Sequence, residues 1–146
     1  AIMNTASEVG YGNVISQLPG FAEVANFLIS IHIGGTPLVS EAVSVTVLAG
    51  ITGSASGGLA IALELMAQDW LAWGQSIGMG PEILHRVASM ASGGLDTLPH
   101  NGAVITLLAV CGLTHKESYK DIFAITVLKT FTVFVIIFIY SVTGLH

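Results

Sequence analysis

The stretch GITGSASGG, residues 50–58, separates two apolar runs and decides how this part of the chain folds. Four of its nine residues are glycine and three carry hydroxyl groups. The flanking runs, Leu38 to Ala49 and Leu59 to Trp73, predict helices of roughly 18–22 Å at about 1.5 Å per residue. Neither would cross about 30 Å of hydrocarbon alone. The sequence therefore predicts a re-entrant helical hairpin over residues 37–73, with the glycine-rich stretch at its tip.

The composition is that of a membrane protein. Only 9% of the 146 residues are charged, against roughly 25% in soluble domains, and the mean hydropathy is +0.81. Uncharged stretches of 22, 19 and 17 residues follow Glu41, Asp96 and Lys129. This pattern excludes a soluble enzyme, and four basic residues leave no patch for a nucleic-acid partner. We predict an all-α integral membrane protein with several membrane-embedded helices.

A second interrupted element is predicted over residues 83–113. A helix from Ile83 to Ala91 runs into the sequence SGGLDTLPHNG at residues 92–102, and the apolar run then resumes from Ala103 to Leu113. Unwound backbone at membrane depth is tolerated only when it is buried in protein or lines a polar cavity. The pattern therefore predicts a broken transmembrane helix.

The two ends of the chain complete the predicted organisation. Residues 1–33 are expected to form a helix end and an interfacial arm, with an amphipathic helix from Phe21 to Ile33. Residues 121–143 are expected to form the last transmembrane helix. Lys129 lies inside it and is expected to snorkel toward the end that carries Lys116 and Lys120, which marks that end as cytoplasmic.

The two breaks predict an anion site. Discontinuous helices direct free N–H groups and positive dipole ends to one place, which favours a carboxylate. The candidate substrate-binding residues are small or polar: Thr52, Ser54, Ser56, Gly57 and Gly58 at the tip, and Ser92, Gly93, Thr97 and Asn101 in the second break. The alternative is close helix packing, because Gly53 and Gly57 have the spacing of a small-residue packing motif.

Asp96 and His100 are the ionisable residues of the second break. Both are costly at membrane depth unless they are paired, hydrated or functional, so both are candidates for proton coupling. His100 is alternatively a neutral, hydrogen-bonded residue beside Pro99. Glu41 and Glu64, which flank the tip, are expected to be helix-end or interfacial carboxylates.

Four stretches together resemble the gluconate:proton symporter family: GITGSASGG (50–58), HRVASMASGG (85–94), DTLPHNGA (96–103) and THKESYKD (114–121). The resemblance covers essentially the whole chain. It implies a multi-pass carrier of the bacterial inner membrane that takes up gluconate or a related hydroxy or sugar acid with a proton. Members of the family are longer, so residues 1–146 are expected to be the C-terminal part of the transport domain.

That family is similar to the ion-transporter superfamily, whose second repeat consists of a hairpin, a broken helix and a last helix. The resemblance implies that the tip and the unwound helix bind the carboxylate together, through Ser54, Ser56 and Gly57 on one side and Thr97, His100 and Asn101 on the other. The implied partners are the organic anion, the proton, the lipid bilayer and the N-terminal repeat of the same protein, with a homo-oligomer left open.

Two alternatives remain at this point. One is an intramembrane hydrolase that uses a serine with His100 and Asp96, although no serine has a nucleophile-elbow context. The other is a carrier of a different short organic anion such as hydroxybutyrate, which also offers one carboxylate and a hydroxyl. We expect a transporter rather than an enzyme, with no cofactor and no metal site.

Overall fold

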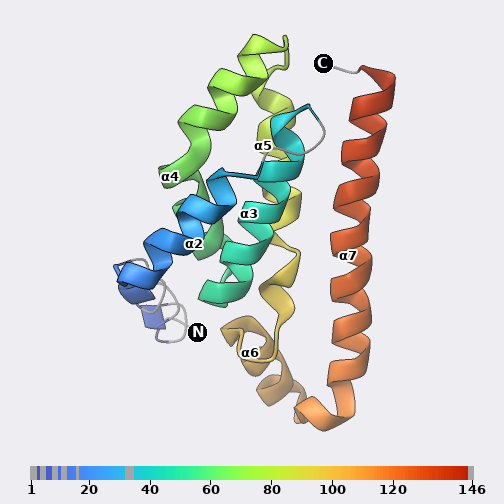
Figure 1. Cartoon of the computed structure of the whole chain (residues 1–146). Helices are drawn as coiled ribbons and strands as arrows, with labels where there is room; N and C mark the ends of the chain where they lie inside the picture. Colours follow the sequence, from blue (N-terminus) through green and yellow to red (C-terminus); the bar gives the residue numbers. More distant parts are fainter. Residues whose placement is uncertain are drawn as a thin grey trace.

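The computed structural model describes residues 3, 6, 7, 10, 13–15, 17–31 and 35–144. These residues contain helices and no strand, as predicted. The elements in chain order are α2 (Pro19–Ile29), α3 (Pro37–Thr52), α4 (Ala55–Ser76), α5 (Pro81–Ser92), the short 3-10 helix η1 (Leu95–Thr97), α6 (Gly102–Cys111) and α7 (His115–Thr143) (Figure 1).

The hairpin of α3 and α4 turns on two residues rather than nine. α3 continues through Gly50 to Thr52, and α4 begins at Ala55, so the predicted long tip is wrong. Gly53 ends α3 in the left-handed conformation, with φ of 64°, which a glycine adopts without strain. Ser54 then caps α4 by accepting a hydrogen bond of 3.2 Å from the backbone N–H of Gly57. One glycine and one capping serine are therefore enough to reverse the chain.

The two helices of the hairpin approach so closely that their backbones are in contact. A Cβ atom on Gly58 would lie only 2.2 Å from the backbone nitrogen of Ala49. α4 extends to Ser76, beyond the predicted end at Trp73, and its 22 residues make it about 33 Å long. α5 packs against both helices. The core lies between these three helices, and its most deeply buried side chains include Leu38, Val45, Leu48, Met66 and Val87.

The predicted broken helix is present as three pieces. α5 ends at Ser92, η1 covers Leu95–Thr97, and α6 begins at Gly102. η1 contacts both α3 and α7. The first part of the interruption therefore packs between α3 and α7, whereas Pro99 and His100, which follow it, are exposed.

α7 begins six residues before the predicted start at position 121. The reason is a capping box, in which the Thr114 N–H donates to the Glu117 carboxylate at 2.9 Å and the Thr114 hydroxyl donates to it at 2.7 Å. α7 has 29 residues, and among the described residues it is the one helix long and apolar enough to cross a membrane. The structure thus supports one span directly, where the sequence predicts several.

The N-terminal arm is described only in part. α2 begins at Pro19, two residues before the predicted start, and ends at Ile29. Phe21 and Leu28 are buried against the core. The remainder of the predicted helix, at residues 32 and 33, lies outside the described residues.

The close approach of Gly58 to Ala49 predicts that a single methyl group added at position 58 lowers the thermal stability of the protein. Gly58→Ala in the full-length protein should lower the midpoint of thermal unfolding by about 5 °C or more, because the two helices must separate to admit the Cβ atom. Gly20→Ala is the matched control, since a Cβ there meets nothing within 4 Å. Equal midpoints for the two variants would contradict the backbone contact.

The arrangement of the helix ends predicts a membrane topology. The loop between α4 and α5 lies at the same end of the molecule as the end of α7, and the turn between α6 and α7 lies at the other (Figure 1). In a cysteine-free background of the full-length protein, Ile77→Cys and Thr143→Cys should react with an impermeant thiol reagent from outside the cell. Ser118→Cys should react only from the cytoplasm, next to the Lys116 and Lys120 cluster. Labelling of positions 77 and 118 from one side contradicts this topology.

Candidate functional site

The tip of the hairpin and the broken helix meet, as the resemblance implies. The Asn101 side-chain amide donates to the Gly53 carbonyl at 2.6 Å, and His100 Nε2 lies 2.9 Å from the Gly50 carbonyl. Because a carbonyl oxygen only accepts, Nε2 carries the hydrogen in this bond. Elements about fifty residues apart in sequence are thus joined by two side chains of the unwound segment.

Asn101 also caps α6. Its Oδ1 accepts from the backbone N–H of Ala103 at 2.7 Å, and the side chain is 3% exposed. Since Gly53 directly precedes Ser54, which caps α4, the bond from Asn101 to Gly53 places the capping residues of α4 and α6 near each other. Helix N-termini carry partial positive charge and free N–H groups. The joined region is therefore suited to an anion.

The three hydroxyls of the tip differ in their availability. Thr52 is buried, and its hydroxyl donates to the Leu48 carbonyl at 2.8 Å. The Ser54 hydroxyl lies 3.3 Å from that of Ser56, which is exposed. Ser54, Ser56 and Gly57, which were predicted to lie in a tip before a helix that begins at Leu59, instead form the N-cap and first turn of α4. Gly58 packs against α3, which is the alternative that the sequence left open.

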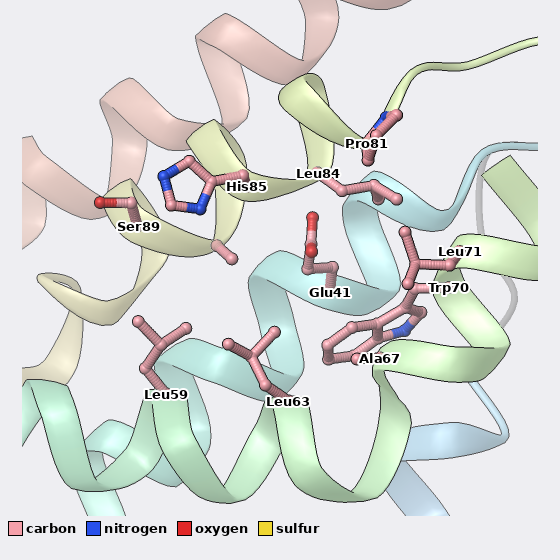
Figure 2. A pocket seen from close by; sticks show the side chains of 11 residues that line it. Glu41, Leu59, Leu63, Ala67, Trp70, Leu71, Pro81, Leu84, His85 and Ser89 are labelled. Carbon is pink, nitrogen blue, oxygen red and sulfur yellow. The ribbon is translucent and has the colours of Figure 1, made fainter.

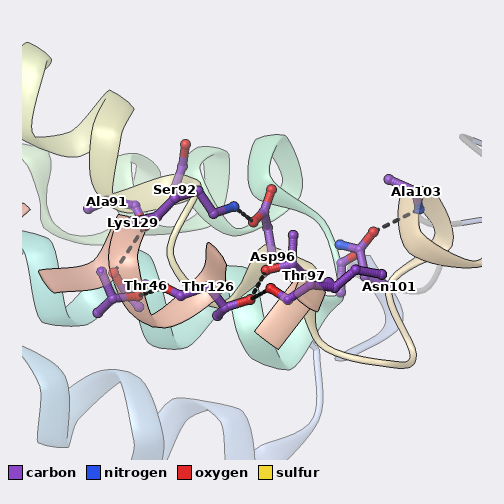
Figure 3. Close-up of polar contacts among 12 residues, drawn as sticks. Thr46, Ala91, Ser92, Asp96, Thr97, Asn101, Ala103, Thr126 and Lys129 are labelled. Atoms are coloured by element: carbon purple, nitrogen blue, oxygen red, sulfur yellow. Dashed lines mark hydrogen bonds and ion pairs between the residues drawn. The ribbon is translucent and has the colours of Figure 1, made fainter. Parts of the chain in front are cut away.

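In the first half of the break, the polar side chains of Asp96 and Thr97 contact α7. Asp96 Oδ1 lies 2.9 Å from Lys129 Nζ, and the two side chains are 24% and 35% exposed (Figure 3). Lys129, which was expected to snorkel toward the cytoplasmic end, thus has Asp96 as a partner within the protein. The hydroxyls of Thr97 and Thr126 share a hydrogen bond beside this ion pair.

Ser92 and Gly93 lie at the end of α5. The Ser92 hydroxyl donates to the Ser89 carbonyl at 2.8 Å, and a Cβ on Gly93 would come within 4.0 Å of Lys129 Nζ. The predicted site residues consequently form two groups. The tip group consists of Thr52, Ser54, Ser56, Gly57, Gly58, His100 and Asn101, and the α7 group consists of Ser92, Gly93, Asp96 and Thr97.

The two ionisable residues of the break have different partners. Asp96 binds Lys129 and His100 binds a backbone carbonyl, so the acid–histidine pair that a hydrolase would need is not assembled in this segment. Within the described ranges, no three His, Cys, Asp or Glu side chains are grouped as metal ligands.

Thr46 and Lys129, which the sequence analysis did not select as site residues, hold the break in place. A Cβ on Gly94 would lie 2.7 Å from a methyl carbon of Thr46, whose hydroxyl donates to the Ala91 carbonyl at 3.0 Å. Lys129 could have been selected from the sequence, because it is a single cation within an apolar helix. Such a cation calls for a partner, and Asp96 is the acid within reach.

Comparison with known proteins gives one clear relationship. No family model and no solved structure matches the chain. A protein of Bacillus subtilis (strain 168) named "Uncharacterized transporter YxjC" is 59% identical over 145 residues, or 99% of this chain. The chain is homologous to part of a transporter. It spans 30% of the length of that relative. The homology and the apolar α7 together support a membrane location.

The ion pair predicts non-additive stability effects. Asp96→Asn and Lys129→Met should each destabilise the protein, because each leaves one charge without its partner. The double variant should recover part of the loss, with a coupling free energy of about 1 kcal/mol or more. Thermal or denaturant unfolding of the full-length protein measures this cycle, and Lys116→Met serves as the exposed-lysine control. Additive losses would show that the pair contributes nothing.

Proposed function

We propose that this chain forms one half of the substrate site of a secondary active transporter that takes up gluconate, or a related hydroxy or sugar acid, with a proton across the bacterial inner membrane. The observation that carries the proposal is the junction of two helix N-termini, capped by Ser54 and Asn101 and linked by the bond from Asn101 to Gly53. Transporters bind anionic substrates at such ends of discontinuous helices.

The chemistry of the junction favours a carboxylate that carries hydroxyl groups. The first turns of α4 and α6 offer backbone N–H donors to the carboxylate. Ser56 is exposed beside them and can bond a substrate hydroxyl, while Gly57 leaves the backbone of α4 open to close approach. Gluconate and hydroxybutyrate both present these groups, and the resemblance to the gluconate:proton symporters favours gluconate.

The other half of the site is assigned to the N-terminal repeat of the same protein. The chain spans 30% of its relative's length, which leaves a longer segment to supply a second hairpin and a second broken helix. The apolar side chains on the outside of α7, among them Phe123, Phe131 and Phe138, suit lipid or that repeat.

His100 is the first candidate for the coupling proton, and Asp96 is the second. A neutral His100 that donates through Nε2 to Gly50 would take up a proton on Nδ1 and keep the same bond. Protonation of Asp96 would instead end its attraction to Lys129 and loosen the contact between the break and α7. Either event would connect protonation to the position of the unwound segment.

The proposal is tested by uptake into proteoliposomes that contain the full-length protein. Labelled gluconate should accumulate under a pH gradient, acidic outside, and a protonophore should abolish the accumulation. Unlabelled hydroxy acids should compete, whereas the corresponding acids without hydroxyls should compete more weakly, because the site then loses its hydroxyl contacts. Absence of uptake of every hydroxy acid, or uptake indifferent to the protonophore, refutes the proposal.

The role of His100 is separable in the same assay. His100→Gln should preserve exchange of labelled for unlabelled substrate but abolish gradient-driven accumulation, because glutamine still bonds to Gly50 yet does not titrate. His115→Gln is the matched control, since His115 also bonds a backbone carbonyl, that of Pro99, at 3.0 Å. If His100→Gln accumulates substrate normally and Asp96→Asn does not, the acid is the carrier.

A further inference from the structure

A cavity of about 230 Å³ lies between α3, α4 and α5, apart from the junction of the tip and the break. Six apolar side chains form most of its wall: Leu59, Leu63, Ala67, Leu71, Leu84 and Ala88. Figure 2 shows Glu41 directed from α3 into this cavity, with His85 on α5 across from it. The cavity thus combines an apolar wall with one carboxyl group.

Glu41 is buried without a full set of partners. The side chain is 2% exposed, and its Oε2 has no hydrogen-bond partner among the described residues. Trp70 also lines the cavity, but its indole N–H already donates to Ser40 at 3.3 Å. An unpaired carboxylate in an apolar setting is costly, whereas the neutral acid is tolerated. The expectation of an interfacial carboxylate at position 41 does not match this burial.

The groups around Glu41 supply no fixed positive charge. Among the described residues that line the cavity, His85 is the other titratable group, and α4 contributes no charged side chain. No described residue of α2 or α7 lines it. Arg86 lines a neighbouring pocket with Ile136 and Tyr140, and this pocket shares His85 and Ser89 with the cavity. This setting is the opposite of that of Asp96, which has Lys129 within 2.9 Å.

We propose that Glu41 is a proton-binding site of the transporter and that His85 exchanges the proton between this cavity and its surroundings. Glu41 as the acid releases its proton, by way of water in the cavity, to the neutral imidazole of His85, which gives a carboxylate and an imidazolium, and the imidazolium then loses the proton to water outside the cavity. His85 is exposed, so it can reach both sides of this exchange. The ligand of the cavity is therefore a proton.

The position of Glu41 connects this site to the tip. Glu41 and Gly50, whose carbonyl binds His100, lie on the same helix, nine residues or about 14 Å apart. A change of charge at Glu41 acts on the packing of α3 against α4 and α5, and α3 carries the tip. The coupling role of Glu41 rests on the proposed function, but its protonation does not.

Infrared difference spectroscopy of the full-length protein tests the protonation directly. A step in pH should produce a C=O stretching band of a protonated carboxyl group, shifted in D₂O, and Glu41→Gln should remove it. Glu64→Gln is the matched control, because Glu64 is exposed on α4 and should leave the band unchanged. Glu41→Asp should retain a band at an altered frequency, which separates loss of the group from loss of the fold.

Transport tests the coupling. Each coupled proton multiplies the equilibrium accumulation about tenfold per pH unit, because one pH unit corresponds to about 1.4 kcal/mol. Glu41→Gln should therefore lose one factor of about ten in accumulation while substrate exchange continues, and Glu64→Gln should lose none. His85→Gln should slow the proton exchange at Glu41 without removing the infrared band.

The outcomes are distinct. A band that survives in Glu41→Gln, or accumulation that is unchanged in this variant, overturns the proposal. If the wild-type protein transports none of the hydroxy acids, the proposed function fails, and the infrared band alone then decides whether Glu41 binds the proton.

Discussion

Buried backbone groups that leave a helix must find partners within the protein, and this requirement joins the hairpin to the broken helix. Here the side-chain amide of Asn101 meets it at both breaks, because it donates to the Gly53 carbonyl and accepts from the Ala103 N–H. The same residue ends one interruption and anchors the other. Removal of that amide would leave polar backbone groups in both elements without partners, which explains why the hairpin and the broken helix form one unit.

Two acids are buried or half-buried in the described part of the chain, Glu41 and Asp96, and their surroundings differ. Asp96 lies beside a lysine, and the ion pair between them attaches the break to α7. Glu41 faces leucines and a tryptophan, with a histidine as its ionisable neighbour. One carboxyl group thus has a lysine as its ion-pair partner, and the other lies in a mainly apolar cavity without a lysine or arginine in its lining.

The sequence predicted the element types well and their ends less well. Uncharged runs and the two clusters of glycine and polar residues were enough to locate the hairpin and the broken helix. The length of the tip was overestimated because glycine and serine were counted as helix breakers, although Gly50 and Gly58 lie inside helices whose packing excludes larger side chains. The start of α7 was missed although Thr114 and Glu117 carry the capping-box spacing.

Pairings between elements were harder to foresee. Periodicity places a residue on a face of its own helix but does not say which other helix that face meets. Lys129 and Asp96 are 33 residues apart, and the bond from His100 to Gly50 spans 50. The burial of Glu41 likewise depends on α5 covering a helix that begins 44 positions earlier in the chain.

The absence of a side chain at Gly58 has a mechanical consequence. Because the backbones of α3 and α4 are in contact at Gly58, the two helices cannot slide past each other without a steric clash. The hairpin therefore behaves as one rigid unit. Gly35 and Gly78, both with positive φ and with open space around them, flank its base. Glu41 lies near that base and the tip lies at the far end. A small rotation of the hairpin about its base would therefore displace the tip by a larger distance, away from Asn101.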